Sequence, residues 1–127
     1  MKKSQVKELD KLFSQLILKL DGGKCVICNT TERLCTHHWY KSKKRGGYAT
    51  RWTLENGIAI CVGCHLDAHL NTGQFILKLE TIKGREWMDE TVYKIDVTLQ
   101  STFKVDYDGV KEFLEGKLKE LEDGMDT

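Results

Sequence analysis

The chain has 127 residues, 40% of them hydrophobic and 31% charged, which suits one modest globular core and argues against several domains or intrinsic disorder. No apolar run approaches the length of a transmembrane helix. The net charge of +1 conceals an asymmetry, because residues 1–75 contain 12 Lys and Arg against 6 Asp and Glu, whereas residues 76–127 contain 8 against 13. A basic half joined to an acidic half is compatible with a nucleic-acid-binding face in the first half.

The predicted elements begin with an amphipathic helix over Ser4–Leu20, whose apolar residues recur every three or four positions. Asp21-Gly22-Gly23 predicts its end, because glycine readily takes the left-handed conformation that closes helices. The following region, up to Cys64, has no long helical period. It contains two strand candidates, Arg33–Tyr40 and Gly57–Cys61, which we expect to pair antiparallel.

The second half is predicted to be mainly helical. Helices are expected over Val62–Leu70, with an end near Asn71-Thr72-Gly73, and over Gln74–Ile82. Arg85–Leu99 is ambiguous between helix and strand, and Asp108–Glu122 returns to clear amphipathic spacing.

The cysteines indicate a metal site. The charged residues 1–10 do not resemble a signal peptide, so we expect a cytoplasmic protein, in which disulfides are rare. Four of the five cysteines form two C-x-x-C pairs separated by 32 residues: Cys25, Cys28, Cys61 and Cys64. Four thiolates on two tight bends suit tetrahedral zinc, which would also stabilise a region with few apolar residues. Cys35 is expected simply to pack.

Two other interpretations of the cysteines are weaker. Cys61-Val62-Gly63-Cys64-His65 also matches the C-x-x-C-H signature of covalent haem attachment. Haem attachment requires export and a distal ligand, and it leaves the first cysteine pair unexplained. A redox pair or buried free thiols are the remaining alternatives, and a reducing compartment favours zinc over both.

The four histidines form two pairs. His65 and His69 are four residues apart on a predicted helix, so their rings lie on one face within about 6 Å and can bind one metal ion. His37 and His38 are neighbours in a predicted strand, so their side chains point to opposite faces. One can complete a three-histidine metal site while the other accepts a proton near neutral pH, as in a hydrolytic site. The alternatives are packed or surface histidines, or a histidine that replaces a cysteine on the zinc.

Four segments carry a family resemblance: Cys25-x-x-Cys28, Thr36-His37-His38-Trp39, Leu54-Glu55-Asn56-Gly57-Ile58 and Cys61-x-x-Cys64-His65-x-x-x-His69. In this order and spacing they resemble the HNH endonucleases, whose fold is the ββα-metal fold. The resemblance implies that His38 is the general base and that Asn56 holds and polarises it. It further implies that His37, His65 and His69 bind the catalytic metal ion, and that the cysteines form the structural zinc site of many members.

The resemblance also implies an architecture. We expect an α+β protein with a small ββα-metal (HNH) core and a four-cysteine structural zinc site, flanked by N- and C-terminal helices. Residues 1–127 form a single domain in this scheme, with an N-terminal helix in 1–23, the zinc-bound nuclease core in 24–73 and a mainly helical C-terminal extension in 74–127. The three-histidine ligand set is similar to that of colicin-type nucleases. Residues 49–57 and the charged tail near 106–122 are similar to phage recombination endonucleases of the NinG (Rap) group.

The resemblance implies single-metal hydrolysis of DNA phosphodiester bonds. The narrower resemblance implies that the substrate is branched or recombination DNA. If the chain is phage-encoded, the reaction takes place in the host cytoplasm. His38 would deprotonate the attacking water, while the ion stabilises the phosphorane and the leaving 3′ oxygen. Three imidazoles suit Zn²⁺, Ni²⁺ or Mn²⁺ better than Mg²⁺, which also remains a candidate.

Substrate contacts are predicted in residues 41–51, of which five are cationic: Lys41, Lys43, Lys44, Arg45 and Arg51. Such a cluster is typical of phosphate binding, and Arg51, nearest to Asn56, is the strongest candidate for a phosphate or transition-state contact. Trp39, Tyr40, Tyr48 and Trp52 could stack on bases or turn inward as core residues. No base-reading element is present, so the sequence predicts no base specificity.

Two non-enzymatic interpretations are also compatible with the sequence. The first is a non-catalytic zinc-stapled module that binds nucleic acid, and the second is an interaction protein that uses its terminal helices. These helices can pack on the core or form a homodimer, and two turns of heptad-like spacing do not separate the two. Recombination, restriction and homing roles, and duplex or branched substrates, are all compatible with the sequence.

Overall fold

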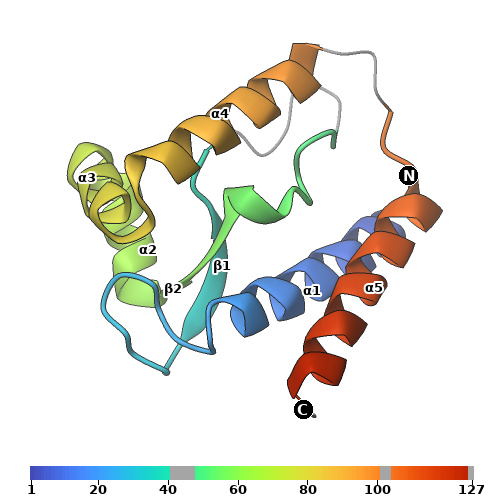
Figure 1. Ribbon diagram of the computed structural model, residues 1–127, viewed down its shortest axis with the longest axis horizontal. Coiled ribbons are helices and arrows are strands. Elements are labelled where there is room, and N and C mark those ends of the chain that lie inside the picture. The colour runs from blue at the N-terminus through green and yellow to red at the C-terminus, as the bar shows by residue number, and fades with distance from the viewer. Residues whose placement is uncertain (41–47, 101–103, 126–127) are drawn as a thin grey trace.

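The computed structural model describes residues 1–40, 48–100 and 104–125 (Figure 1). In chain order its elements are α1 (Lys3–Leu20), β1 (Leu34–His38), the 3-10 helix η1 (Leu54–Asn56), β2 (Gly57–Cys61), α2 (Val62–Leu70), α3 (Thr72–Lys83), α4 (Arg85–Gln100) and α5 (Tyr107–Met125). The described part of the chain is therefore α+β, with five α-helices and one two-stranded antiparallel sheet, which confirms the predicted class. None of the described helices is both long and apolar enough to cross a bilayer.

Most element boundaries agree with the sequence pattern. α1 ends one residue before Asp21, and Gly22 and Gly23 follow with φ of +75° and +71°, the left-handed conformation expected of a glycine stop. The expected break after α2 is shorter than predicted, because Asn71 alone separates α2 from α3. The ambiguous segment is the helix α4, whose buried residues Met88, Thr91 and Ile95 follow helical spacing.

The strands pair in one register, from Leu34 opposite Cys61 to His38 opposite Gly57. Side chains of a strand alternate between its faces, and the contacts of β1 follow that rule. Thr36 shares a hydrogen bond of 2.9 Å with Ser14 of α1, whereas His37 packs against His65 of α2 with a centroid distance of 5.0 Å. The hairpin therefore has an α1 face and an α2 face.

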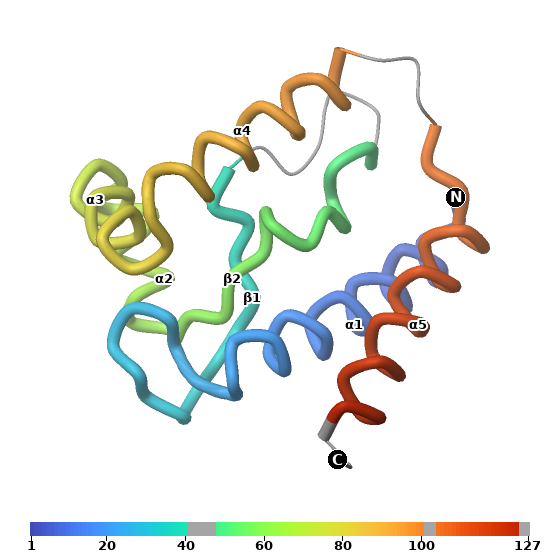
Figure 2. The backbone as a smooth tube through the Cα atoms, in the orientation of Figure 1, coloured from blue at the N-terminus to red at the C-terminus, as the bar shows by residue number. Residues whose placement is uncertain are grey.

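A separate core covers each face of the hairpin. The core on the α1 face contains Leu9, Phe13, Leu16, Ile17, Trp52, Ala59 and Leu114. The core on the α2 face contains Cys25, Trp39, Ile58, Ile60, Ala68, Phe75, Leu79 and Met88. Figures 1 and 2 show α1 and α5 on one side of the hairpin, and α2, α3 and the start of α4 on the other.

Helix α5 runs beside α1 in the same direction. Glu8 near the start of α1 lies 2.9 Å from the ammonium of Lys111, and Lys19 near its end lies 3.3 Å from Glu122. Both pairs are partly exposed, so their net contribution to stability is small and the buried apolar residues hold the helices together.

Trp39 and Trp52, two of the four aromatic residues considered for base stacking, are buried in the two cores, and Tyr40 is half-buried. Trp39 is buried against Trp87, with a centroid distance of 5.4 Å, and its indole N–H donates to the carbonyl of Glu55 at 2.8 Å. Tyr40 donates its hydroxyl to Asp96 at 3.0 Å. These contacts tie the end of β1 to η1 and to α4.

Candidate metal centres

The four paired cysteines come together at one end of the hairpin. Their sulfur atoms all lie within 4.8 Å of one another: Cys25, Cys28, Cys61 and Cys64. A zinc ion with Zn–S bonds of about 2.3 Å has tetrahedral S–S edges of about 3.8 Å. The Cys28 and Cys61 sulfurs are 3.7 Å apart, so the cluster fits a structural zinc ion.

Local backbone geometry builds each half of this cluster. In the first pair, the N–H of Cys28 points at the Cys25 sulfur at 3.5 Å, and Asn29 closes the turn with φ of +66°. In the second pair, Cys61 is both the last residue of β2 and the N-cap of α2, and its sulfur accepts from the N–H of Cys64 at 3.4 Å. Burial raises the pKa of Cys25, but backbone N–H groups outweigh it and lower that pKa to about 7, which favours a thiolate at this position. Burial raises the pKa of Cys64. A backbone bond to Thr30 lowers the pKa of Cys28, but the neighbouring thiols outweigh it and raise that pKa.

Three histidines form a second cluster beside the first. The ligating nitrogens of His37, His65 and His69 lie within 4.8 Å of one another. The Nε2 atoms of His65 and His69 are 3.1 Å apart, close to the edge of about 3.3 Å in a tetrahedron with metal–nitrogen bonds of about 2.0–2.1 Å. The pair on α2 and one histidine of β1 thus lie close enough together to hold one metal ion.

Two histidines of this cluster, His37 and His65, have a lowered pKa, which favours the neutral form that binds metals. Burial, followed by the charges of His65, His69 and His38, lowers the pKa of His37 to about 4. Burial and the charge of His69 likewise lower the pKa of His65. Phe75 of α3 meets the His37 ring edge-on, with a centroid distance of 5.7 Å, and limits its orientation.

Cys35 lies between the two clusters. Its sulfur is 3.6 Å from Nδ1 of His65 and 3.3 Å from the carbonyl of Ile60. With a metal on Nε2, neutral His65 carries its proton on Nδ1 and can donate it to this sulfur, an orienting contact typical of metal-bound histidines. Burial raises the pKa of Cys35, followed by the charges of Cys61 and Cys25, so the thiol stays protonated.

His38 points to the other face of the hairpin. Its ring stacks on Phe13 of α1 with a centroid distance of 5.5 Å and an interplanar angle of 6°, and its Nε2 lies 2.7 Å from the main-chain carbonyl of Arg51. A carbonyl only accepts, so Nε2 carries the proton and Nδ1 keeps its lone pair. Burial lowers the pKa of His38 overall, which leaves the imidazole neutral near pH 7.

Asn56 binds the residues that follow β1. The hydrogen bond of His38 described above goes to Arg51 and not to Asn56. The side-chain oxygen of Asn56 accepts from the N–H of Tyr40 at 2.8 Å, and its carbonyl accepts from the N–H of Trp39 at 3.1 Å. Asn56 is fully buried, and both bonds fix the two residues after His38. The structure thus connects Asn56 with His38 through these neighbouring residues, and the catalytic role of Asn56 stays a prediction.

Arg51 is held by Asp10 of α1, a residue that sequence reasoning missed. Its guanidinium donates to both carboxylate oxygens, at 2.9 and 2.8 Å, and Trp52 donates its indole N–H to the same carboxylate at 2.9 Å. Burial raises the pKa of Asp10, but these hydrogen bonds outweigh it and keep the pKa below its ordinary value. Asp10 sits in an amphipathic helix with no motif around it, so nothing in the sequence marks it.

A cavity of about 430 Å³ opens beside His38, and none of the three clustered histidines lines it. Its walls include Asp10, Phe13, Thr36, His38 and Arg51. The predicted phosphate-binding residues Lys41, Lys43, Lys44 and Arg45 lie outside the described residues.

No protein-family model, no curated protein and no solved structure matches this chain. The function is therefore argued from the geometry of the two clusters and the residues around them.

Proposed function

We propose that this chain is a metal-dependent DNA endonuclease of the HNH type, with His37, His65 and His69 binding a divalent ion and His38 acting as general base. The observation that carries the proposal is the convergence of three imidazoles from β1 and α2, with a fourth histidine adjacent on the strand and hydrogen-bonded to a carbonyl. The order β1, β2, α2 is also the one expected of a ββα-metal core.

The protein residues have separable roles in this proposal. His38 donates Nε2–H to Arg51, so its Nδ1 is left to take a proton from water. Asp10 and Phe13 hold the two partners of that hydrogen bond in place. A divalent ion on the three imidazoles would supply positive charge for phosphate oxygens. No carboxylate ligand in this set would neutralise that charge.

DNA is the proposed substrate because residues 41–51 concentrate five cations directly after the histidine pair in the sequence. The narrower proposal, following the resemblance to phage recombination endonucleases, is that branched DNA is preferred. The four cysteines act in both versions as a structural zinc site.

The decisive experiment compares the wild-type chain with His38→Ala on supercoiled, linear and four-way-branched DNA, with Mg²⁺, Mn²⁺, Ni²⁺ and EDTA. Gln74→Ala, at an exposed position of α3, is the matched control for the effect of substitution and purification. We expect His38→Ala to lower cleavage by at least about 100-fold, the scale of general-base catalysis, while Gln74→Ala cleaves as wild type.

The alternative function, a non-catalytic zinc-stapled module, makes the opposite prediction. It requires DNA binding without cleavage under every metal. Equal cleavage by wild type and His38→Ala would refute the proposed base, provided that both chains retain equal zinc content and helical circular dichroism.

A further inference from the structure

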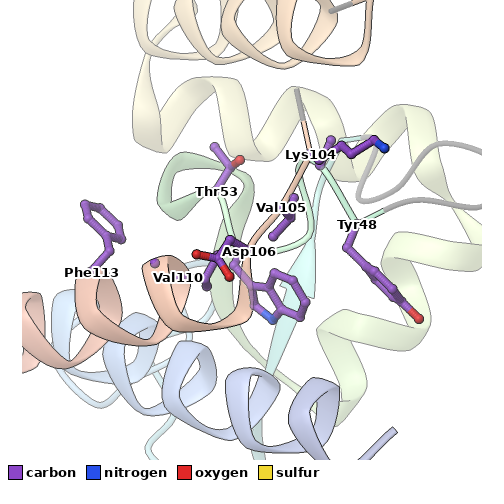
Figure 3. A pocket seen from close by; sticks show the side chains of 10 residues that line it. Tyr48, Thr53, Lys104, Val105, Asp106, Val110 and Phe113 are labelled. Carbon is purple, nitrogen blue, oxygen red and sulfur yellow. The ribbon is translucent and has the colours of Figure 1, made fainter. Parts of the chain in front are cut away.

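A second cavity adjoins the segment whose Arg51 carbonyl binds His38. It has a volume of about 290 Å³, between residues 48–53 and the start of α5 (Figure 3). Its apolar walls come from Tyr48, Trp52, Val105, Val110 and Phe113. Nothing in the candidate nuclease site uses this space.

The lining of the cavity suits a flat aromatic ring. Tyr48 and Trp52 stack on one another at 5.7 Å with an interplanar angle of 28°, and Tyr48 and Phe113 stand on opposite sides of the cavity in Figure 3. The volume is at the low end of ligand pockets, about 300–1,000 Å³, and so suits one base rather than a larger ligand. Base stacking on aromatic side chains is a general mode of single-strand binding.

The polar residues at the same cavity add complementary chemistry. The carboxylate of Asp106 can accept a hydrogen bond from an amino or imino N–H of a base. Lys104, which is exposed, offers a positive charge for a neighbouring backbone phosphate. An aromatic slot with one acceptor and one cation discriminates against purely apolar ligands.

One short segment joins the cavity to the candidate base. Tyr48 and Trp52 flank Arg51, whose N–H donates to the Tyr48 carbonyl at 3.1 Å and whose own carbonyl binds His38. Asp10 holds Arg51 and Trp52 through one carboxylate. The cavity and His38 are therefore linked through the short segment of residues 48–52.

We propose that the cavity binds one unpaired nucleobase of a DNA strand, so that the enzyme favours substrates with unstacked bases. The inference rests on the proposed function, since it takes DNA as the ligand. It goes further by assigning a base-binding subsite to Tyr48, Trp52 and Asp106.

Gly109 allows the cavity to be filled without removing any of its contacts. It lines the cavity in the first turns of α5, and an added Cβ would meet only the Asp106 side chain, at 3.5 Å or more. Gly116, two turns further along α5, has no atom within 4 Å of an added Cβ and is not part of the cavity. Gly109→Leu and Gly116→Leu are therefore a matched pair, and Phe113→Ala, at a half-exposed wall, serves as a second test.

The test uses zinc-loaded full chain carrying His38→Ala, so that DNA stays intact. The probe is an oligonucleotide with a central 2-aminopurine, offered as a single strand and as a perfect duplex. We expect binding of the single strand to quench the 2-aminopurine fluorescence. Gly109→Leu should remove the quenching and weaken single-strand affinity about 5- to 100-fold, the contribution of stacking one base, with duplex affinity unchanged. Phe113→Ala should shift both readouts in the same direction, and Gly116→Leu should match its parent.

Single-strand binding and quenching by Gly109→Leu at the level of its parent would overturn the inference. An equal loss of single-strand and duplex affinity would also overturn it, because it would indicate a general DNA surface. Failure of the nuclease proposal is distinguishable, since the chain with His38 restored would then bind and quench without cleaving.

Discussion

Gly57 tests the packing of α1 against the hairpin. It lies in β2 opposite His38, and a Cβ built on it would lie 2.7 Å from Cζ of Phe13 and 2.9 Å from Cγ1 of Ile17. Carbon atoms in contact prefer about 3.5–4.0 Å, so Gly57→Ala must push two buried side chains of α1 away by roughly 1 Å. Overpacking of this kind costs about 1–3 kcal/mol, or a decrease in Tm of roughly 4–12 °C for a chain of this size.

The sign of this effect is informative, because alanine is otherwise the better strand and helix residue. Without the close approach, Gly57→Ala would be neutral or would stabilise by about 0.5–1 kcal/mol. Gly116→Ala in the open interior of α5 is the matched control and should stabilise by up to about 1 kcal/mol. Thermal unfolding of the zinc-loaded chains, followed by circular dichroism, measures both. A Gly57→Ala chain as stable as Gly116→Ala would refute this packing of α1 on the hairpin.

Three further predictions concern the metal centres and the Asp10 network. Cys64→Ser should abolish zinc binding and lower Tm, whereas Cys35→Ser, outside the four-sulfur cluster, should retain the zinc. Equal zinc content of the two variants by elemental analysis would contradict the four-cysteine site. His37→Ala should remove a second, chelator-labile ion without loss of zinc. The readout is the visible absorption of added Co²⁺, which this variant should lose. An unchanged spectrum would exclude the three-histidine site. The lowered pKa of Asp10 contributes stability that is present above its ordinary value of 3.8 and is lost as pH falls through the folded pKa. Urea unfolding should therefore show wild type and Asp10→Asn converging in stability below pH 4, and a difference independent of pH would contradict the Arg51 pairing.

The convergence of the cysteines and of the histidines could be predicted because their signals are local. Two cysteines at C-x-x-C spacing share one turn whatever the rest of the fold does, and His65 and His69 share one helix face. The opposite directions of His37 and His38 follow from the twofold period of a strand. The register that brings β1 to α2 then needs only one antiparallel pairing, between two strands that follow one another in the sequence.

The partners of the candidate base could not be predicted in this way. The atom that binds His38 is a main-chain carbonyl, which every residue has, so the identity of Arg51 carries no information about that contact. Phe13 and Asp10 lie in α1, 25 or more residues before His38 in the sequence. In the amphipathic pattern of that helix, Phe13 occupies an ordinary core position and Asp10 an ordinary surface position. Trp39 and Tyr40 show the converse, because aromatic residues near a basic segment suit DNA or a core equally well until the neighbours Trp87 and Asp96 are known.

Helix α2 explains why the two clusters belong together. It has nine residues, fewer than the roughly 12–15 that an isolated helix needs, and Ala68 is its one buried residue. Packing therefore gives α2 little stability, whereas structural zinc in small domains contributes about 10–16 kcal/mol of binding free energy. β2 enters α2 without a loop, and Cys64 directly precedes His65. Zinc on the four cysteines would thus fix the start of α2 and, through the rigid helical turn that follows, the direction in which His65 and His69 face His37.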